Sequence, residues 1–544
     1  MRRLAALFLL LAGIGCGFAR AAPGGTLRLV TASASGSFDP QINYTNRYWE
    51  IFQAMYDGLV SFAKTSGPES FKVVPDLATA IPAPADHGTT YVFHLRPGIE
   101  FSNGEPVTVQ AVVHSFRRLF RVNSPNAGTW YDVIIGGRRC AAHPRHCSLP
   151  GLVGNAAEGT VTFHLRHPDS EFLDQLAVPF ASILPADTPE HDMGTTPIPG
   201  TGAYMARSYS PASGIVLVRN PHFREWSAAA QPGGFPDRID YHFGLTAEAQ
   251  VSAVENGQYD WMFEDVPADR LNEIATRYTR QVHINPVNYF FYLPMNIHIP
   301  PFNDKDARLA VEYAVNRASM VKLFGGPALA APTCQILPPE MPGYRPYCPY
   351  TKNPGAKWSA PDWRKARAYM KKSGMTGQPV TIITEVQSPF REIGIYLQSV
   401  LNRLGFRASV KPLSPDIEFT YIQNSANKVQ ISVTDWAQDY AAPSDFLNVL
   451  FSCKSFHPAS DDSINMTGFC DPAIDREMQK AIVLSVRHPR QGDALWAHVD
   501  HQITRRALVA SLFSVKKLDF VSARLRNFTF SGEYFFLPQL AMVK

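Results

Sequence analysis

The stretch Trp436-Ala437-Gln438-Asp439-Tyr440-Ala441-Ala442-Pro443-Ser444-Asp445-Phe446-Leu447 places a carboxylate between two large aromatic residues and ahead of a proline. A carboxylate in apolar surroundings is costly to bury unless a cation meets it. Asp439 is therefore a candidate partner for the ammonium group of a ligand. The alternative is that Asp439 is a turn or cap carboxylate, and Trp436 and Tyr440 equally suit a protein core.

The beginning of the chain, residues 1–21, has the pattern of an export signal. Arg2 and Arg3 precede an apolar run from Leu4 to Ile14, and Ala19-Arg20-Ala21 offers the small residues that a signal peptidase recognises. The apolar run is well short of the roughly 20 residues that a membrane span needs. We therefore expect an exported, periplasmic protein.

Cys16 raises the alternative of cleavage before a lipidated cysteine. Gly13, three residues upstream, fits that signal poorly, because an aliphatic residue is usual there. Lipid anchoring through Cys16 is therefore the disfavoured alternative.

Composition narrows the class of protein. Removal of Arg2, Arg3 and Arg20 with the signal lowers the formal charge from +4 to +1, which gives no reason to expect a nucleic acid as partner. With 45% hydrophobic residues the chain can bury large cores, and its 44 prolines and 36 glycines indicate many loops. Strand and helix signals alternate along the chain, which predicts α/β lobes.

The motifs of common enzymes are missing. The sequence contains no G-K dipeptide, and therefore no Walker A loop, and no H-E-x-x-H, G-x-S-x-G or C-x-x-C. An S-x-x-K match begins at each of four serines, without the motifs that accompany it in serine hydrolases: Ser61, Ser319, Ser425 and Ser514. We expect no enzymatic activity and no cofactor; an exported serine hydrolase is the alternative from another class.

The cysteines that follow the signal form three local pairs. An oxidising compartment favours the bridges Cys140–Cys147, Cys334–Cys348 and Cys453–Cys470. The alternative at the first pair is a zinc site made of Cys140, His143, His146 and Cys147. Zinc sites usually draw their ligands from two separated elements, so the disulfide is preferred and no metal is expected.

Local patterns predict several elements. Residues 26–31 and 508–515 are predicted strands, and residues 46–57 a helix stopped by Gly58. Residues 108–121 form an amphipathic pattern with a cap near Thr108, and residues 305–324 are predicted as one helix.

Six blocks in order resemble the family 5 solute-binding proteins of bacterial ABC importers, which include the oligopeptide and dipeptide binders. The spacing W-x-x-D-Y-x-x-P-x-x-F-L from Trp436 is one of them. The other five lie earlier in the chain: Phe38-Asp39-Pro40 with Tyr56-Asp57-Gly58, Tyr91 to Thr108, Pro199 to Tyr204, Glu255 to Asp260, and Pro301 to Asp304 leading into Arg308 to Arg317. Ala203 and Asn316 depart from the family pattern, where proline and aspartate are usual. Gly200-Thr201-Gly202 alone is a weak signal for phosphate binding.

The resemblance implies a two-lobed periplasmic-binding-protein fold with hinge crossovers and an additional small domain inserted in the first lobe. The expected division is residues 22–66, 196–288 and 508–544 for lobe one, 67–195 for the inserted domain and 289–507 for lobe two. The two crossovers are expected at Tyr289 to Asn296 and Arg505 to Phe513.

The resemblance also implies a function and a site. We expect a monomer that captures a peptide or peptide-like solute and delivers it to an ABC permease and ATPase complex at the inner membrane. The ligand would lie extended, with its ammonium on Asp439, near Tyr440, and beside the backbone of Trp436 and Ala437. Tyr44, Thr45 and Asn46 are the expected contacts from lobe one. The alternative within the fold is a non-peptide solute such as a metal chelate, a sugar or a peptide conjugate.

Overall fold

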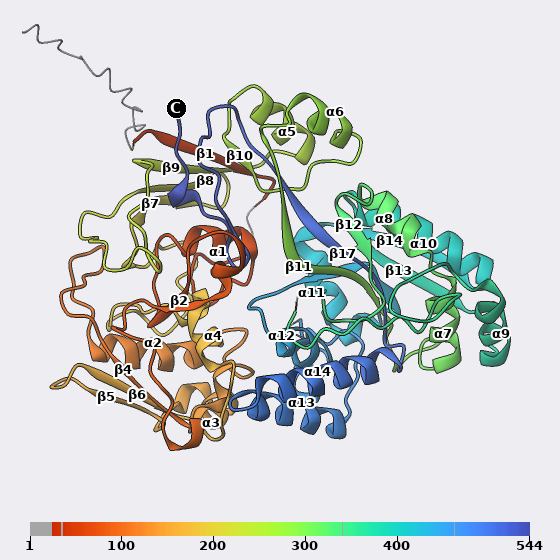
Figure 1. Cartoon of the computed structure of the whole chain (residues 1–544), viewed down its shortest axis with the longest axis horizontal. Coiled ribbons are helices and arrows are strands. Elements are labelled where there is room, and N and C mark those ends of the chain that lie inside the picture. Colours follow the sequence, from red (N-terminus) through yellow and green to blue (C-terminus); the bar gives the residue numbers. More distant parts are fainter. Residues whose placement is uncertain (1–23, 34–35, 340, 462) are drawn as a thin grey trace, which may run out of the picture.

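The computed structural model describes residues 24–33, 36–339, 341–461 and 463–544. Within these ranges the chain forms two α/β lobes joined by two long strands (Figure 1). The predicted export signal and Cys16 lie outside the described residues. No helix in the described ranges has the length and apolar character needed to span a membrane.

The first lobe is built on a five-stranded sheet with the order β10-β1-β9-β8-β7. Its strands are β1 (Thr26–Thr31), β7 (Tyr204–Ser210), β8 (Gly214–Arg219), β9 (Arg238–Phe243) and β10 (Trp261–Met262). The strand predicted at residues 26–31 is confirmed, and it runs parallel to both β9 and β10. The predicted helix at residues 46–57 is shorter, because α1 (Asn46–Phe52) ends five residues before Asp57.

A small sheet with the order β4-β6-β5 lies below this lobe in Figure 1. Its elements are β4 (Thr90–His94), β5 (Leu152–Asn155), β6 (Thr160–His164) and the neighbouring helices α2 (Val109–Arg121), α3 (Gly137–Ala142) and α4 (Phe172–Ala177). The hydroxyl of Thr108 accepts the Ala111 N–H at 3.1 Å, so the predicted cap is confirmed. One hydrophobic core runs through this region and the first lobe. It includes β2 (Val60–Phe62), which pairs antiparallel with the half-buried β3 (Val73–Pro75).

The second lobe contains a parallel sheet with the order β14-β13-β15 and most of the helices. Its strands are β13 (Pro379–Glu385), β14 (Arg407–Leu413) and β15 (Ile431–Ser432). Its helices are α7 (Lys305–Ala314), α8 (Arg317–Phe324), α9 (Trp363–Ser373), α10 (Phe390–Leu404), α11 (Pro415–Gln423), α12 (Pro443–Phe451), α13 (Pro472–Ser485) and α14 (Pro489–Thr504).

The prediction of one helix at residues 305–324 was wrong. The chain leaves helical geometry at Val315, and the side chain of Asn316 accepts the Ser319 N–H at 3.2 Å to begin α8. An asparagine that caps a new helix competes with the continuous helix, and here the cap prevails.

Two long antiparallel strands, β11 (Val282–Pro294) and β17 (Val509–Phe520), connect the lobes (Figure 1). They form the centre of a sheet with the order β12-β17-β11-β16, where β12 is Ala330–Pro332 and β16 is Thr434–Ala437. The pairing of β11 with β17 is irregular between Pro286 and Phe290. The two expected hinge crossovers are thus two paired strands, and β17 extends beyond the strand predicted at residues 508–515.

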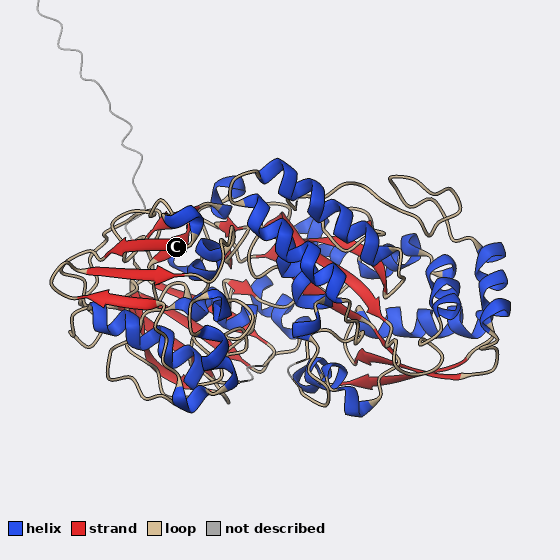
Figure 2. Cartoon of the chain, turned by 90° about the horizontal axis from the view of Figure 1, so that it is seen from below, coloured by secondary structure: helices blue, strands red, loops and turns tan. Residues whose placement is uncertain are grey.

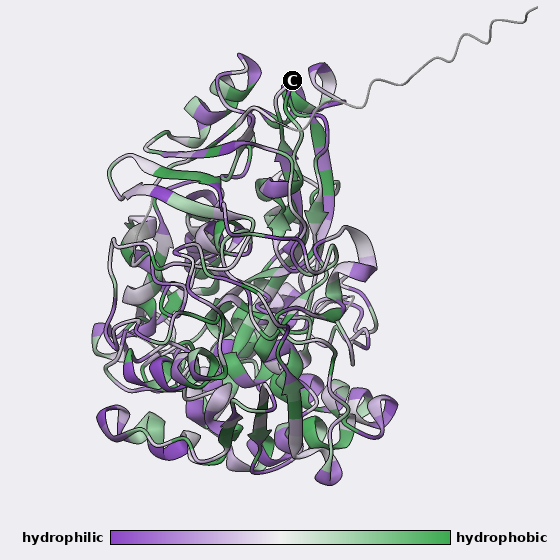
Figure 3. Ribbon diagram, turned by 90° about the vertical axis from the view of Figure 1, so that its left-hand side faces the viewer, coloured by the Kyte–Doolittle hydropathy of each residue, from purple (hydrophilic) through white to green (hydrophobic). Residues whose placement is uncertain are grey.

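Strands lie toward both ends of the molecule with helices packed around them (Figure 2). Hydrophobic segments are concentrated on the inner strands (Figure 3). The buried side chains of the second lobe form two separate hydrophobic cores. A smaller cluster joins β1 and β17 to α5 (Ala247–Glu255) and α6 (Leu271–Arg277). The C-terminal segment returns to the first lobe, where β18 (Phe530–Ser531) pairs with β19 (Phe535–Phe536).

The predicted disulfide bonds Cys140–Cys147, Cys334–Cys348 and Cys453–Cys470 are all present. The zinc alternative at Cys140 and Cys147 is therefore excluded for the oxidised chain.

Several of the blocks that carry the family resemblance are scaffold. A Cβ atom on Gly200 or Gly202 would lie within 2.5 Å of a backbone carbonyl oxygen of residues 54–55, so both positions require close backbone contact. The hydroxyl of Thr201 donates to Asp57 at 2.6 Å and joins two of the blocks. Gly200-Thr201-Gly202 is thus a packing turn, not a phosphate loop.

Candidate ligand-binding site

Asp439 lies at the boundary between the lobes and reaches across it. Its side chain is 8% exposed, and its Oδ2 atom accepts a hydrogen bond from the hydroxyl of Tyr44 in the first lobe. Burial is the main cause that raises the pKa of Asp439 to about 7. Asp439 and Tyr44, predicted to face one ligand, thus contact each other directly across the boundary between the lobes.

Tyr44 is held in place by its neighbours in sequence. Its ring packs against Trp49, Trp130 and Phe180, with the Phe180 ring centroid 5.3 Å away. Before it, the Asn43 carbonyl accepts the Trp49 indole N–H at 3.0 Å. After it, Thr45 donates its hydroxyl to Asn43 at 2.8 Å.

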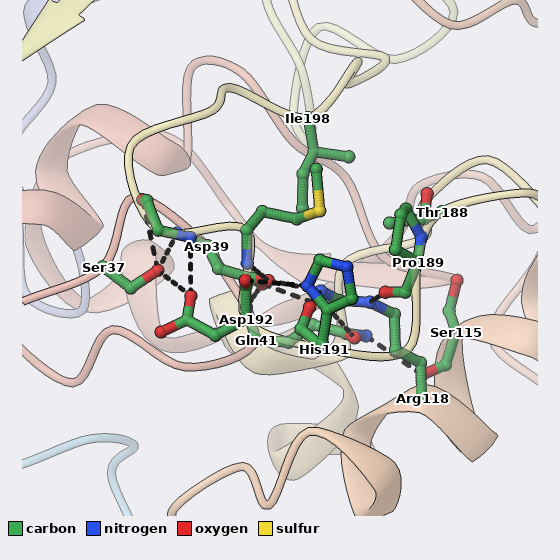
Figure 4. A network of polar contacts seen from close by, with 12 residues as sticks. Ser37, Asp39, Gln41, Ser115, Arg118, Thr188, Pro189, His191, Asp192 and Ile198 are labelled. Atoms are coloured by element: carbon green, nitrogen blue, oxygen red, sulfur yellow. Dashed lines mark hydrogen bonds and ion pairs between the residues drawn. The ribbon is translucent and has the colours of Figure 1, made fainter.

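A buried ion pair supports the segment that leads to Tyr44. Arg118 from α2 donates to both carboxylate oxygens of Asp39, one bond being 3.1 Å, and also to Gln41 at 2.8 Å (Figure 4). Arg118 and Asp39 are both fully buried. Backbone carbonyls of Pro189 and His191 accept the remaining guanidinium donors, so α2 and residues 37–43 are locked together.

The turn that presents Asp439 is organised by Asp445. Asp445 accepts the Asp439 N–H at 2.8 Å on Oδ2, and its backbone carbonyl accepts the Trp436 indole N–H at 3.1 Å. The Trp436 side chain is buried in a core of the second lobe. The role of a turn carboxylate thus falls to Asp445, which leaves the Asp439 side chain free to reach the other lobe.

Tyr440 packs into the first lobe, although it comes from the second. Its ring meets Trp130 edge-on at 5.4 Å, and its hydroxyl lies 3.2 Å from the Ser444 hydroxyl and 3.4 Å from the Gln175 amide nitrogen. Ser444 in turn donates to Glu171 of the region around the small sheet. Tyr440 therefore contacts residues on both sides of the boundary between the lobes.

The C-terminal segment adds a further contact. Glu533 accepts the Ala441 N–H at 3.1 Å and the Gln438 side-chain amide at 3.1 Å. Glu533 and Glu171 were not among the predicted site residues, since only the folded chain brings residues so distant in sequence together.

The boundary is rich in buried carboxyl groups. Burial is the main cause that raises the pKa values of Glu171, Asp439, Asp445 and Glu533, and neighbouring acids add to it for Glu171, Asp445 and Glu533. In the described part of the chain, no lysine, arginine or histidine forms a salt bridge with these four groups; Lys454, at the same boundary, pairs with Asp132 at 2.9 Å. A cationic group that entered here would meet unneutralised acceptors.

Among the described residues, cavities lined from both lobes include the following two. The smaller, about 140 Å³, is lined by Trp130, Gln175 and Tyr440, and the larger, about 420 Å³, by Asn46, Asp435 and Lys516. Trp130 Nε1 and Gln175 Oε1 are buried, and neither has a hydrogen-bond partner among the described residues. They offer one donor and one acceptor, which is the pair that a peptide unit satisfies.

The backbone of Trp436 and Ala437 lies in β16, at the edge of its sheet. β16 pairs with β11 on one side only, with Ala437 opposite Tyr289. An edge strand of this kind can accept an extended chain by strand addition.

Two α/β lobes joined by paired strands, with a buried polar site between them, form the arrangement of a solute-binding protein. The family model for bacterial extracellular solute-binding proteins, family 5, matches residues 72–457. The chain belongs to this family.

Relatives of known name agree with this assignment. The chain is 26% identical over 488 residues to the probable D,D-dipeptide-binding periplasmic protein DdpA of Escherichia coli, covering 87% of this chain and 86% of that protein. It is also 26% identical over 487 residues to the dipeptide-binding protein of Escherichia coli, covering 84% and 83% of the two chains.

Solved structures share the fold over nearly the whole length. The clavulanic acid biosynthesis oligopeptide binding protein 2 superposes with a TM-score of 0.84 at 24% identity, covering 96% of each chain. The periplasmic binding protein DppA of Helicobacter pylori, solved with the peptide STSA, gives a TM-score of 0.79 at 18% identity and covers 96% of this chain and 98% of its own.

Proposed function

We propose that the protein captures peptides or peptide-like solutes in the periplasm and delivers them to the permease and ATPase of an ABC importer. The observation that carries this proposal is Asp439, a buried carboxyl group at the lobe boundary whose hydrogen-bond partner is the hydroxyl of Tyr44. A ligand ammonium would replace that hydroxyl and form a stronger, charge-assisted hydrogen bond.

The surroundings of Asp439 suit the main chain of a peptide. The edge strand β16 offers backbone groups, and the smaller cavity offers the unpartnered Trp130 donor and Gln175 acceptor. The named relatives are peptide-binding proteins, which supports the same substrate class here. Binding without chemical turnover, a monomeric state and export through residues 1–21 belong to this proposal.

Lys516 is the candidate for the carboxylate end of the ligand. It is an exposed residue of β17 that lines the larger cavity, and no salt bridge to it is found within the described ranges. The sequence alone offered no arginine or lysine for this role.

The proposed division follows the expected boundaries. Lobe one comprises residues 22–66, 196–288 and 508–544, the inserted domain residues 67–195, and lobe two residues 289–507. The core shared by the first two suggests that they move together when the lobes open.

A thermal-shift screen with di- to pentapeptides tests the function. A ligand that binds only the folded protein stabilises it by about 2.7 kcal/mol at 100 times its dissociation constant. Native mass spectrometry of the purified protein would identify a carried ligand. No shift with any peptide, together with a clear shift with a sugar or a metal chelate, would overturn the peptide assignment.

A further inference from the structure

The two walls of the larger cavity differ in how their acids are neutralised. On the wall from the first lobe, Arg47 pairs with Glu264 at 3.2 Å and Lys517 with Asp265 at 3.4 Å. Glu50 also lines this wall; it is 2% exposed, and its Oε1 atom has no hydrogen-bond partner among the described residues. Glu50 thus keeps one buried oxygen without a hydrogen bond, although the Phe536 backbone and the charges of Lys517 and Arg47 also act on its carboxyl group.

The wall from the second lobe carries the acids Asp435 and Glu385. Asp435 accepts the hydroxyl of Tyr289 at 2.7 Å, and Glu385 accepts the side-chain amide of Gln387 at 2.9 Å. Glu418 is not itself a lining residue; it lies near both acids, is 2% exposed, and its Oε1 atom has no hydrogen-bond partner within the described ranges. Among the described residues, no lysine, arginine or histidine forms a salt bridge with Asp435 or Glu418.

Uncompensated buried carboxylates are unfavourable until a cation reaches them. Burial raises the pKa of Asp435 to about 7, and burial followed by the charges of Glu385 and Asp435 raises the pKa of Glu418. The only exposed cation on the cavity, Lys516 among the described lining residues, belongs to β17 and is assigned above to the ligand carboxylate.

We infer that the larger cavity takes a positively charged side chain of the ligand, of the lysine or arginine type, against Asp435 and Glu418, with Glu50 facing it from the other lobe. This inference rests on the proposed function, and it names the substrate class more narrowly. The cavity of about 420 Å³ exceeds the roughly 150 Å³ that encloses a benzene molecule, so a long side chain fits.

The spacing between Asp435 and Asp439 also indicates which residue of the ligand carries the positively charged side chain. Asp435 and Asp439 are four residues apart, which is at most roughly 13 Å of extended chain, and β16 ends between them at Ala437. We therefore expect a ligand whose ammonium lies on Asp439 to reach Asp435 with the side chain of its second or third residue.

Calorimetry with matched tripeptides tests the inference. The probes are Ala-Lys-Ala, Ala-norleucine-Ala and Ala-Glu-Ala, which present a cation, a hydrocarbon of similar length and an anion. We expect Ala-Lys-Ala to bind at least about tenfold more tightly than the norleucine peptide, and the glutamate peptide to bind worst. Lys-Ala-Ala and Ala-Ala-Lys then locate the preferred position.

Variants assign the preference to residues. Asp435→Asn keeps an acceptor for Tyr289 and Glu418→Gln keeps the side-chain shape; each should reduce the lysine-over-norleucine ratio several-fold while norleucine binding changes little. Glu158→Gln, at an exposed position in the hairpin between β5 and β6, is the matched control and should leave the ratio unchanged.

The possible results separate the two proposals. Equal binding of the three peptides, or a lysine preference that both variants retain, overturns the inference and leaves peptide binding intact. Absence of binding by any peptide, alongside binding of agmatine or putrescine, overturns the proposed function and supports a cationic ligand. Absence of binding by every peptide and every amine overturns both.

Discussion

The hydroxyl of Tyr44 donates a hydrogen bond to the carboxyl group of Asp439 across the boundary between the two lobes. The two residues are separated by 395 positions in sequence, and each belongs to a segment expected to face the ligand. An incoming ammonium group must therefore displace an internal partner before it binds. Asp439 should therefore increase the affinity for the ligand, whereas the hydroxyl of Tyr44, which competes with the ammonium, should decrease it.

Replacing Asp439 with asparagine should weaken the binding of free-amino peptides. The substitution keeps the shape but removes the charge, and truncating one partner of a buried charged pair typically costs about 2–5 kcal/mol. We expect well over a tenfold loss for a free-amino peptide by calorimetry, and weak binding of its N-acetylated form to the unaltered protein.

The two changes form a double-mutant cycle. If Asp439 is the partner of the ammonium, Asp439→Asn adds little once the peptide is acetylated. Independent, additive losses would instead assign Asp439 a purely structural role.

Replacing Tyr44 with phenylalanine should have the opposite effect on binding. Phenylalanine keeps the packing against Trp49 and Phe180 but leaves Asp439 without its donor. A hydrogen bond to a charged group contributes about 1.5–3 kcal/mol, so the ligand-free protein should open more often. Small-angle scattering should show a larger radius of gyration without ligand, and calorimetry should show affinity for free-amino peptides equal to or above that of the unaltered protein. A large loss of affinity would contradict the displacement of Tyr44.

The stability of the ligand-free protein should fall as the pH rises from about 4 to 7. Burial raises the folded-state pKa of Asp439 to about 7, whereas an unfolded aspartate titrates near about 3.9. The folded state therefore holds the proton more tightly, so this contribution is complete below about pH 4 and is lost as the pH passes through 7. Each such group changes the free energy of unfolding by about 1.4 kcal/mol per pH unit within that window.

Denaturant unfolding at several pH values measures this slope. Asp439→Asn should reduce the dependence of the unfolding free energy on pH by the equivalent of roughly one proton. Asp500, another buried acid whose pKa is raised to about 7, contributes equally to the variant and to the unaltered protein. An unchanged slope would show that Asp439 is ionised in the folded state over the whole window.

Lys516 should matter only for ligands with a free carboxylate. Lys516→Gln removes the charge at an exposed position of β17. An exposed ion pair contributes about 0.2–1 kcal/mol, which corresponds to at most a several-fold loss of affinity. The loss is larger if the lobes exclude water from the ion pair, because buried charges are less screened. Calorimetry should show weaker binding of a free-acid peptide and no change for its C-terminal amide. The same loss for both peptides would remove Lys516 from the role of carboxylate partner.

Removing one partner of the Arg118–Asp39 ion pair should destabilise the protein strongly. Arg118→Met leaves Asp39 buried and uncompensated, which typically costs about 3–5 kcal/mol. The double variant Arg118→Met with Asp39→Leu should lose less than the single variant. Arg117→Met, an exposed neighbour on the same helix, is the matched control and should change the free energy of unfolding by less than about 0.5 kcal/mol.

Local sequence patterns predicted the fold well wherever one signal dominated. The strand predicted over Thr26–Thr31 matches β1 to the residue, and Thr108 caps α2 as expected. The prediction failed at Asn316, where helical periodicity continued across a residue whose side chain begins a new helix. Hydrophobic periodicity indicates which side of a helix can be buried. It does not reveal an interruption of the helix by two residues, such as Val315 and Asn316.

The site was less predictable because its partners are distant in sequence. The position of Asp439 was marked by its aromatic neighbours, but its bond to Tyr44 depends on how the two lobes meet. Asp445 was part of the same stretch, yet only the folded turn shows that it, and not Asp439, accepts the backbone N–H. Glu50, Glu418 and Lys516 carry no motif. Glu50 and Lys516 become candidates only through the cavity that they line, and Glu418 through its proximity to Asp435.

The pairing of β11 with β17 also restricts how the lobes can move relative to each other. Two independent tethers would permit twisting and sliding as well as closing. Hydrogen bonds between the two strands tie them together along their length, so they bend as one unit rather than independently. The ladder irregularity between Pro286 and Phe290 supplies a local weak point for that flexing. The lobes should therefore swing along essentially one rotational coordinate, so that a ligand seated on either lobe meets the other in a single, reproducible alignment.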